Sequence, residues 1–365
     1  MKKHYREKAI NGISWPNRVS SLAPGLLVTL AFAVVSFITW WFLKDTWLKF
    51  SALLWAFVYS IILVNLRPAL FEGKLKAGIE FSSTKLLCWS IALLGLTISA
   101  SVWVKLGGIG LAMVLINLAL VFTFGVVFCK YVLKLDNVLS LLISVGTSIC
   151  GASAIAAVGP ALKAKAEHMG LSVAVITLFG LLAMFLYPLL FAGPLIDWLA
   201  NDNLAYGMWV GTGIHETAQV IAASSQVDNA LSIASSAKFI RIFSIGPMVF
   251  ISQFLLRRFS RMSESGRTRM AVPWFALFFI LFSVIHLGLE SLPIRSQWLY
   301  FNSTYLSPAI TFLLSWSFAA IGLKVKISSI RVVGLKAFLG GMGIAVFAGV
   351  ISLLLVRFLW LPLSS

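Results

Sequence analysis

Two ionisable side chains interrupt an otherwise apolar stretch, "GTGIHETAQVIAA" (211–223). His215 and Glu216 are neighbours in this stretch and have no other charged residue within it. Ionisable groups surrounded by apolar residues are costly to bury and are functional candidates by default. Because histidine titrates near neutral pH, the pair predicts a site that takes up and releases a proton. The alternative is a helix end at which water solvates both groups.

A second stretch, "GTSICGASAIAA" (146–157), opens on the same Gly-Thr pair and is rich in small polar residues. Gly146 and Gly151 weaken a helix, so we expect the chain to unwind here and a new helix to begin near Gly151. The first N–H groups of that helix and the positive end of its dipole would bind an anion. The predicted anion-binding residues here are Thr147, Ser148, Cys150, Gly151 and Ser153. Close helix packing is the alternative, because small residues are also typical of helix contacts.

Two cations follow in the stretch "SAKFIRIFSIGP" (236–247). Lys238 and Arg241 are three residues apart and therefore share one face of a helix. A cationic face between apolar residues requires a polar cavity or counter-ions, and arginine offers a two-pronged donor to an oxyanion. We therefore expect both cations to contribute to an anion site. The alternatives are extension of the side chains to the membrane surface and a structural ion pair with Glu216.

The residues "HETAQ" (215–219) match part of the HExxH pattern of zinc proteases. Gln219 stands in place of the second histidine, so one metal ligand is missing. The sequence therefore predicts neither a metal site nor a cofactor. A nucleophile formed by Cys150 and His215 would make the protein a membrane enzyme, and this alternative stays open because the sequence does not show whether the two residues meet.

The elements that hold these residues must be membrane helices. Of the 365 residues, 60% are hydrophobic and 11% are charged, and the mean hydropathy is +0.96. A soluble protein of this size cannot cover so much apolar side chain, and several uncharged runs reach the roughly 20 residues that span a bilayer. The net charge of +17 comes from short basic clusters between these runs, as in the positive-inside rule, so it predicts no nucleic-acid partner.

The apolar runs predict an all-α polytopic membrane protein, with a cytoplasmic tail at 1–21 and one transmembrane domain at 22–361. The roughly eleven segments are 22–43, 47–64, 77–98, 107–129, 137–158, 166–191, 205–226, 230–257, 272–291, 303–324 and 333–361. If all of them crossed, the basic gaps at 130–134 and 163–165 would lie on opposite sides of the membrane. The conflict disappears if the segments at 137–160 and 205–226 enter the bilayer and return. Discontinuous helices that cross the membrane are the alternative.

A weak internal repeat relates "WSIALLGLTI" (89–98) to "WSFAAIGLKV" (316–325). Each stretch is followed by a short basic linker and another apolar helix. The charge pattern places the two stretches in opposite directions across the membrane, which predicts an inverted repeat of the kind found in many secondary transporters.

The pieces "SICGASAIAA", "GIHETAQVIAA", "KFIRIFSIGP" and "AAIGL" occur in the order and spacing of the YeiH-type family, whose members carry the label sulfate exporter. The chain resembles this family over most of its length. The resemblance implies inverted repeats and discontinuous helices at the middle of the membrane, as in the related cation–proton antiporter and anion transporter group. It implies polar site positions at Ser148, Cys150, Gly151, His215, Glu216, Gln219, Lys238 and Arg241. Cys88 and Thr97 stand where relatives carry arginines, so no role is carried over to them.

Together these observations predict a secondary transporter, not an enzyme, that exports a small inorganic or organic anion such as sulfate or sulfite. The 147–153 region would hold the anion, Lys238 and Arg241 would supply positive field, and His215 and Glu216 would couple transport to protons. An anion channel or uniporter with the same pore groups is the alternative. We expect a bacterial inner-membrane protein with a cytoplasmic N-terminus and a periplasmic C-terminus. Analogy with related transporters suggests a homodimer.

Overall fold

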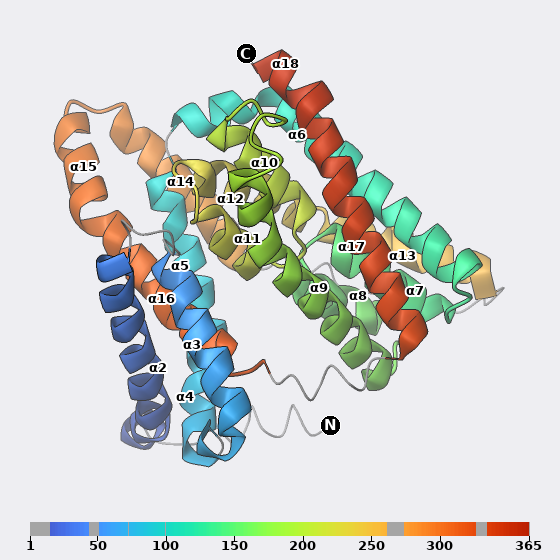
Figure 1. Cartoon of the computed structure of the whole chain (residues 1–365), viewed down its shortest axis with the longest axis horizontal. Helices are drawn as coiled ribbons and strands as arrows, with labels where there is room; N and C mark the ends of the chain where they lie inside the picture. Colours follow the sequence, from blue (N-terminus) through green and yellow to red (C-terminus); the bar gives the residue numbers. More distant parts are fainter. Residues whose placement is uncertain are drawn as a thin grey trace. The chain divides into compact units, whose positions relative to one another are not determined.

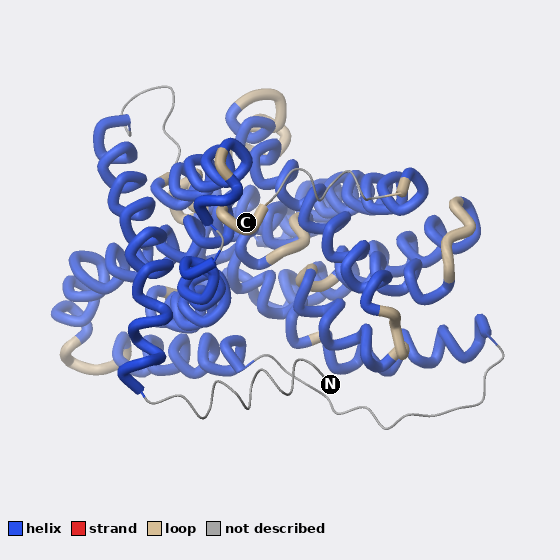
Figure 2. The backbone as a smooth tube through the Cα atoms, turned by 90° about the horizontal axis from the view of Figure 1, so that it is seen from below, coloured by secondary structure: helices blue, strands red, loops and turns tan. Residues whose placement is uncertain are grey.

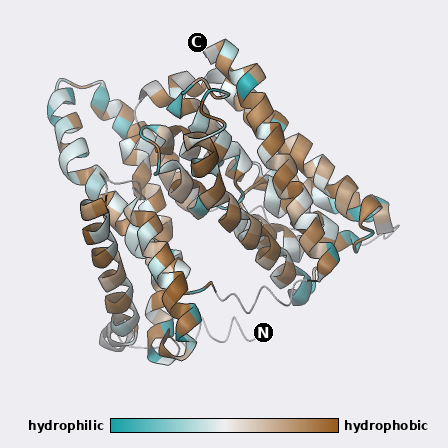
Figure 3. Ribbon diagram, viewed as in Figure 1, coloured by the Kyte–Doolittle hydropathy of each residue, from teal (hydrophilic) through white to brown (hydrophobic). Residues whose placement is uncertain are grey.

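The computed structural model describes residues 15–43, 51–71, 73–98, 100–260, 274–325 and 334–364. Every regular element in these ranges is a helix (Figure 2). Six helices are long and apolar enough to cross a membrane, or seven if the bent pair Ala230–Phe243 and Ile245–Phe259 forms one span. Many large hydrophobic side chains point outward, and the helices are hydrophobic along most of their length (Figure 3). The expected all-α polytopic fold is confirmed. Residues 1–14 of the tail predicted at 1–21 lie outside the described residues. Residues 15–21 already belong to the first helix, so that helix begins seven residues earlier than predicted.

The chain divides into two compact units, and Figure 1 shows the helices of both. The first unit comprises residues 1–94 and 296–327. Its described elements are α2 (Trp15–Leu43), α3 (Ala52–Leu66), η1 (Pro68–Phe71), η2 (Gly73–Leu75), α4 (Lys76–Phe81), η3 (Ser82–Leu86), α5 (Leu87–Leu94), α15 (Arg295–Phe301), η6 (Asn302–Leu306) and α16 (Ser307–Gly322). The second unit comprises residues 95–295 and 328–365 and holds all the predicted site residues.

In the first unit, α16 packs against α2, α3 and α5. The Trp316 Nε1 group donates to the Thr29 hydroxyl across a distance of 2.8 Å, and Lys324 forms an ion pair with Glu80 at 2.9 Å. The stretches at 89–98 and 316–325 begin in α5 and α16. Both helices are preceded by a phenylalanine and a π-helical turn of similar sequence. The stretch before α5 is "FSSTKL", which includes η3, and the stretch before α16 is "FNSTYL", which includes η6. This similarity supports the repeat, whose inverted direction stays a prediction.

The second unit is built around a long helix, α9. The unit's described elements are η4 (Gly95–Thr97), α6 (Ala100–Val127), η5 (Phe128–Val132), α7 (Asn137–Ser148), α8 (Ala152–Ala161), α9 (Ala166–Ala192), α10 (Asn203–Gly213), α11 (Thr217–Ser224), α12 (Ala230–Phe243), α13 (Ile245–Ser260), α14 (Trp274–Glu290), α17 (Leu335–Leu355), η8 (Val356–Trp360) and α18 (Leu361–Ser364). The 27 residues of α9 extend about 40 Å, which is enough to cross a bilayer.

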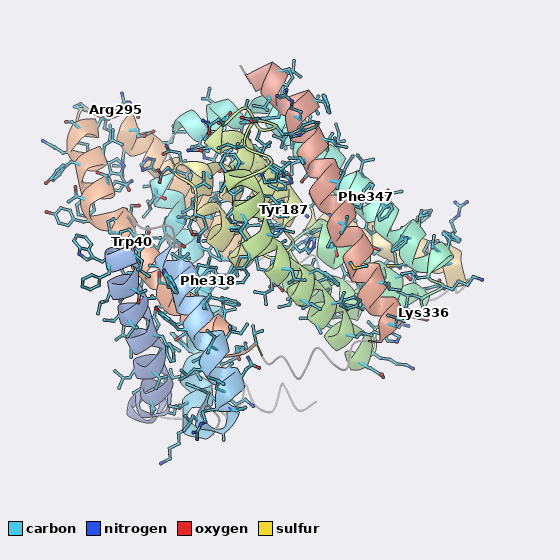
Figure 4. All side chains as sticks on the ribbon, viewed as in Figure 1. Trp40, Tyr187, Arg295, Phe318, Lys336 and Phe347 are labelled. Carbon is cyan, nitrogen blue, oxygen red and sulfur yellow. The ribbon has the colours of Figure 1, made fainter. Side chains whose placement is uncertain are left out.

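The helix α17 lies alongside α9 and runs in the same direction. Gly341 packs directly on Val175, and Gly349 packs on the Tyr187 hydroxyl further along both helices. Tyr187 lies inside the second unit, close to α10 and α17 (Figure 4), and its ring stacks on Trp209 with centroids 4.0 Å apart. The C-terminal end of α17 therefore lies at the same end of the unit as the C-terminal end of α9.

The segment at 137–160 is a helical hairpin that enters and returns. At its base, Asp136 Oδ1 lies 3.8 Å from His168 Nδ1, and Gly159 packs against Met169. Both contacts lie in the first turn of α9, so α7 begins and α8 ends at the same end of α9. The tip of the hairpin, near Gly146, contacts Ile176 further along that helix. The Asp136 side chain caps α7, where its Oδ1 accepts from the backbone N–H groups of Val138 at 2.9 Å and Leu139 at 3.3 Å.

The segment at 205–226 forms a second hairpin, which enters from the opposite end of α9. The Tyr206 hydroxyl near the start of α10 donates to the Ala223 carbonyl near the end of α11, at 3.0 Å. On a continuous helix these residues would be roughly 25 Å apart. Tyr206 also packs on Phe191 in the last turn of α9, with ring centroids 4.6 Å apart. Of the two arrangements left open by the sequence, the re-entrant one therefore holds for both segments.

Candidate functional site

The tips of the two hairpins meet beside the middle of α9. The Thr177 hydroxyl donates to Glu216 Oε1 at 2.9 Å, and Gly146 contacts the neighbouring Ile176. Thr177 is the twelfth of the 27 residues of α9, so the tips lie near the middle of a membrane-spanning helix. Gly151 and Glu216 are in contact there, although they are 65 positions apart in the sequence.

The break in the first hairpin depends on Gly151. This residue has φ +70° and ψ −125° and forms the N-cap of α8, a backbone conformation that favours glycine. A Cβ atom at this position would lie 2.4 Å from Glu216 Cγ. The break was predicted from the sequence, and the new helix begins at Ala152 as expected. It ends at Ala161, one residue beyond Pro160.

Arg241 binds the ends of both incoming helices, α7 and α10. Its side chain is fully buried. The guanidinium donates to five backbone carbonyls, those of Thr147 (2.9 Å), Ser148 (2.9 Å), Gly211 (3.1 Å), Thr212 (2.7 Å) and Ile214 (3.2 Å). The C-terminal carbonyls of a helix carry the negative end of its dipole. Arg241 therefore neutralises the negative helix ends and joins the two tips.

Lys238 complements Arg241 at the second tip. Its side chain is also fully buried. The ammonium donates to the Ile214 carbonyl at 3.0 Å and to the His215 carbonyl. Both cations come from α12, which packs against α6, α10 and α11. The expected shared face is confirmed, and in this structure the two cations bind the backbone of the hairpins. Their direct contact with a substrate stays a prediction.

The outgoing helices, α8 and α11, present the opposite ends of their dipoles. Their first turns contain half-buried residues, whereas the last residues of α7 and α10 are buried. The half-buried residues are Ala152, Ser153, Glu216, Thr217 and Ala218. Free N–H groups and the positive dipole end at a helix start attract anions. The accessible part of the tips is therefore the part that favours negative charge.

Glu216 lies between these two positive ends. It is the N-cap of α11, and its backbone N–H donates to Gln219 Oε1 at 3.3 Å. Its side chain reaches the first hairpin, where it packs on Gly151 and faces the Ala152 N–H. Gln219 in turn donates to the Thr177 carbonyl at 3.2 Å. The capping position explains why a glutamate and a glutamine occur three residues apart in an apolar segment.

His215 is buried between the tips, with 1% of its surface exposed. Among the described residues, no group makes a hydrogen bond of good geometry with either ring nitrogen, and the Thr147 backbone is the polar group beside the ring. Lys238 and Arg241 are the charged groups close to the ring. An unpartnered buried imidazole is a costly feature, which makes His215 a functional candidate in addition to Glu216.

The other predicted residues take different places at the first tip. The Thr147 and Ser148 side chains are buried, and the Ser148 hydroxyl donates to the Val145 carbonyl of its own helix at 3.2 Å. Their contribution to the tip is through their carbonyls. The Cys150 thiol is buried and bonds to the Ser153 hydroxyl, which is half-buried. The structure thus brings all the predicted site residues to the two tips and α12.

Sequence reasoning missed Thr177 on α9, whose hydroxyl bonds to Glu216. Hydroxyl groups are common in the apolar runs of membrane helices, where they can bond to their own backbone, as Ser172 of the same helix does. The only signal available was its central position in the longest uncharged span before the second hairpin.

Comparison with known proteins places the chain among membrane proteins of one family. The family model described as "Conserved hypothetical protein 698" matches residues 24–341. A UPF0324 membrane protein of Pseudomonas aeruginosa is 35% identical over 334 residues, covering 88% of this chain and 90% of its own. The UPF0324 inner membrane protein YeiH of Salmonella typhi is 31% identical, covering 83% of each chain, and YeiH of Escherichia coli is 29% identical with the same coverage.

No solved structure matches the chain. The family model covers well over half of the sequence, including both hairpins and α12. The resemblance found in the sequence motifs is confirmed by this match and by the relatives, several of which are named inner membrane proteins. The chain belongs to the UPF0324 family of membrane proteins, the family of YeiH.

Proposed function

We propose that the protein is a secondary transporter that exports a small anion, such as sulfate or sulfite, across the bacterial inner membrane. The observation that carries the proposal is the polarity of the hairpin tips. Arg241 and Lys238 cover the negative ends of α7 and α10, while the starts of α8 and α11 are partly accessible. Such helix starts bind an anion without placing a full positive charge in the lipid.

The anion binds at the first turn of α8, between Gly151 and Ser153. There the backbone N–H groups and the Ser153 hydroxyl are its donors, and the buried cations behind the tips add positive field. Thr147, Ser148 and Cys150 shape this turn through the backbone, and Gln219 orients the opposite tip. His215 and Glu216 exchange protons and so couple anion movement to the proton gradient.

The arrangement of the hairpins allows the anion site to be reached from either side of the membrane. The hairpins enter from opposite ends of α9, so each tip separates the site from one side of the membrane. Movement of one hairpin at a time would expose the site to one side at a time, as alternating access requires. The proposal therefore needs no helix to unfold during transport.

Proteoliposome transport tests this proposal. Purified protein is reconstituted, and efflux of radiolabelled sulfate or sulfite is followed with and without an imposed pH gradient. The wild type is expected to transport one of these anions faster when the gradient drives protons in the coupled direction. His215→Ala and Glu216→Gln are expected to lose this dependence. Glu80→Gln, which changes a carboxylate in the first unit, is the matched control and is expected to behave like the wild type.

The same assay separates the proposal from the other functions. Strictly downhill flux that ignores the pH gradient in the wild type would identify a channel or uniporter instead. The proposal gives the Cys150 thiol no chemical step, so Cys150→Ala is expected to retain transport. Loss of all flux in a well-folded Cys150→Ala variant would favour chemistry at the thiol.

A further inference from the structure

The entering helices and the returning helix α8 are capped in two different ways at their starts. The entering helices α7 and α10 are capped by their own aspartates, Asp136 and Asp202, whose carboxylates accept from backbone N–H groups at 2.8 to 3.3 Å. The N-cap of the returning helix α8 is Gly151, which offers no side chain. The carboxylate that lies at this start is Glu216, which belongs to the other hairpin.

Glu216 is held at the start of α8 by specific contacts. Its Oε1 atom accepts from the Thr177 hydroxyl at 2.9 Å, and the Ala152 N–H faces the carboxylate. Its side chain packs so closely on Gly151 that no Cβ fits between them. The first turn of α8 therefore already holds an oxyanion, and this oxyanion is part of the protein. The occupied place is the one that the proposed function gives to the substrate.

The charged groups around Glu216 do not offset the repulsion between its carboxylate and a second anion bound beside it. Lys238 on α12 is the cation that acts on Glu216, but its ammonium is engaged by the Ile214 and His215 carbonyls. Helix α9 contributes the neutral Thr177 hydroxyl, α8 contributes N–H groups, and His215 is the titratable neighbour on the same loop. An anion at the start of α8 would therefore meet a negative charge at contact distance whenever Glu216 is ionised.

We propose that Glu216 is an internal anion that competes with the transported anion for the start of α8. This inference rests on the proposed function and gives its coupling a physical cause. When the carboxylate takes a proton from water, it becomes a neutral carboxyl group and no longer competes for the helix dipole. The substrate then binds the freed N–H groups, so one proton is bound for each anion. When the anion leaves, Glu216 releases the proton and returns to the start of α8.

Sulfate binding to the purified protein in detergent tests the competition directly, because the charge of sulfate is constant around neutral pH. Affinity is measured by calorimetry at pH 6 and pH 8, and proton uptake is followed with an indicator dye in weak buffer. The wild type is expected to bind sulfate about ten- to a hundredfold more tightly at pH 6 and to take up about one proton per sulfate at pH 8. Glu216→Gln is expected to bind equally at both pH values without proton uptake.

Glu80→Gln is the matched control and is expected to keep the wild-type pH dependence. Two results would overturn the competition. One is a wild type that binds sulfate equally at both pH values without taking up protons, a measurement that needs no variant. The other is a Glu216→Gln protein that keeps the wild-type dependence.

In either of these cases, continued sulfate transport in proteoliposomes would leave the proposed function in place. If the wild type neither binds nor transports sulfate, sulfite or nitrate at any pH, the proposed function fails together with the competition.

Discussion

At the scale of single residues, Arg241 decides how the two hairpins are joined. It is fully buried and faces no carboxylate at the tips; its five acceptors are all carbonyls of the two incoming helices. A buried charge is tolerated when its donors are satisfied. Arginine suits this position because its planar group has five N–H donors in a fixed arrangement, which a lysine ammonium cannot reproduce.

Replacing Arg241 with methionine is expected to destabilise the protein strongly. The change leaves several buried carbonyls without a donor, and charged hydrogen bonds contribute roughly 1.5–3 kcal/mol each. We expect a loss of at least about 3 kcal/mol, measured by denaturant unfolding in detergent. Arg241→Lys should recover part of it. The exposed Arg295→Met is the control, expected to stay within about 0.5 kcal/mol of the wild type. Equal stability of R241M and R295M would contradict the joining role.

Gly151 is the residue at which backbone conformation and the site depend on each other. Gly151→Ala places a Cβ against Glu216 in a left-handed backbone conformation, so we expect a cost of about 1–3 kcal/mol and displacement of Glu216 from α8. Gly170→Ala is the matched control in α9, since nothing lies within 4 Å of that position. Thermal unfolding and sulfate binding check the pair. A Gly151→Ala protein with wild-type values in both would show that the contact is unimportant.

At the scale of the elements, the two helical hairpins bring the polar groups of the site to the middle of the membrane. Each enters, turns at a glycine-containing break and returns, so its backbone groups at the tip are exposed to the other hairpin. Such irregular backbone is tolerated at membrane depth only where protein or water satisfies it. Arg241, Lys238 and Glu216 provide that satisfaction here.

Cysteine labelling tests the hairpin geometry. In a variant whose three native cysteines are alanine, single cysteines replace the exposed residues Lys134, Lys163, Asn201 and Asp228. Because both ends of each hairpin lie at one end of α9, we expect a membrane-impermeant maleimide to label the first two from one side and the last two from the other. Labelling of positions 134 and 163 from opposite sides would require crossing helices and would exclude the hairpins.

At the scale of the whole molecule, the direction of α17 fixes where the chain ends relative to α9. The two helices run in the same direction, and Arg357 near the end of α17 lies over the Trp198 ring beyond the end of α9, at 5.9 Å from its centroid. The loop after α9 contains Asp197 and Asp202, whereas the loop before it contains Lys163 and Lys165. The positive-inside rule then predicts a periplasmic C-terminus.

Reporter fusions at the C-terminus test this orientation. A periplasmic end is expected to give an active alkaline phosphatase fusion and a dark green-fluorescent-protein fusion, because each reporter folds on one side only. The same reporters placed after Lys163 serve as the control and are expected to show the reverse pattern. A fluorescent C-terminal fusion with inactive phosphatase would reverse the predicted topology of the whole chain.

Composition and local pattern were enough to show that the chain lies in a lipid bilayer, that it is all-α, and where its helices break. Apolar runs of this length are stable in lipid. Glycine weakens a helix and an ionisable side chain is costly to bury in lipid. Both effects are local, so these residues mark interruptions of a membrane helix whatever the fold. For this reason the unwinding at Gly151, the place of His215 and Glu216 at the second break, and the shared face of Lys238 and Arg241 could be predicted from short stretches.

Which groups face one another followed only from the folded arrangement of the two hairpins. Arg241 bonds to Ser148, which is 93 positions away, and Glu216 lies against Gly151 in the other hairpin. No periodicity or local spacing encodes such contacts, because they depend on the depth at which two separately inserted hairpins stop. The sequence therefore located the cations and the carboxylate, whereas the fold directed the cations to the carbonyl ends of the helices and left the carboxylate at the end that attracts anions.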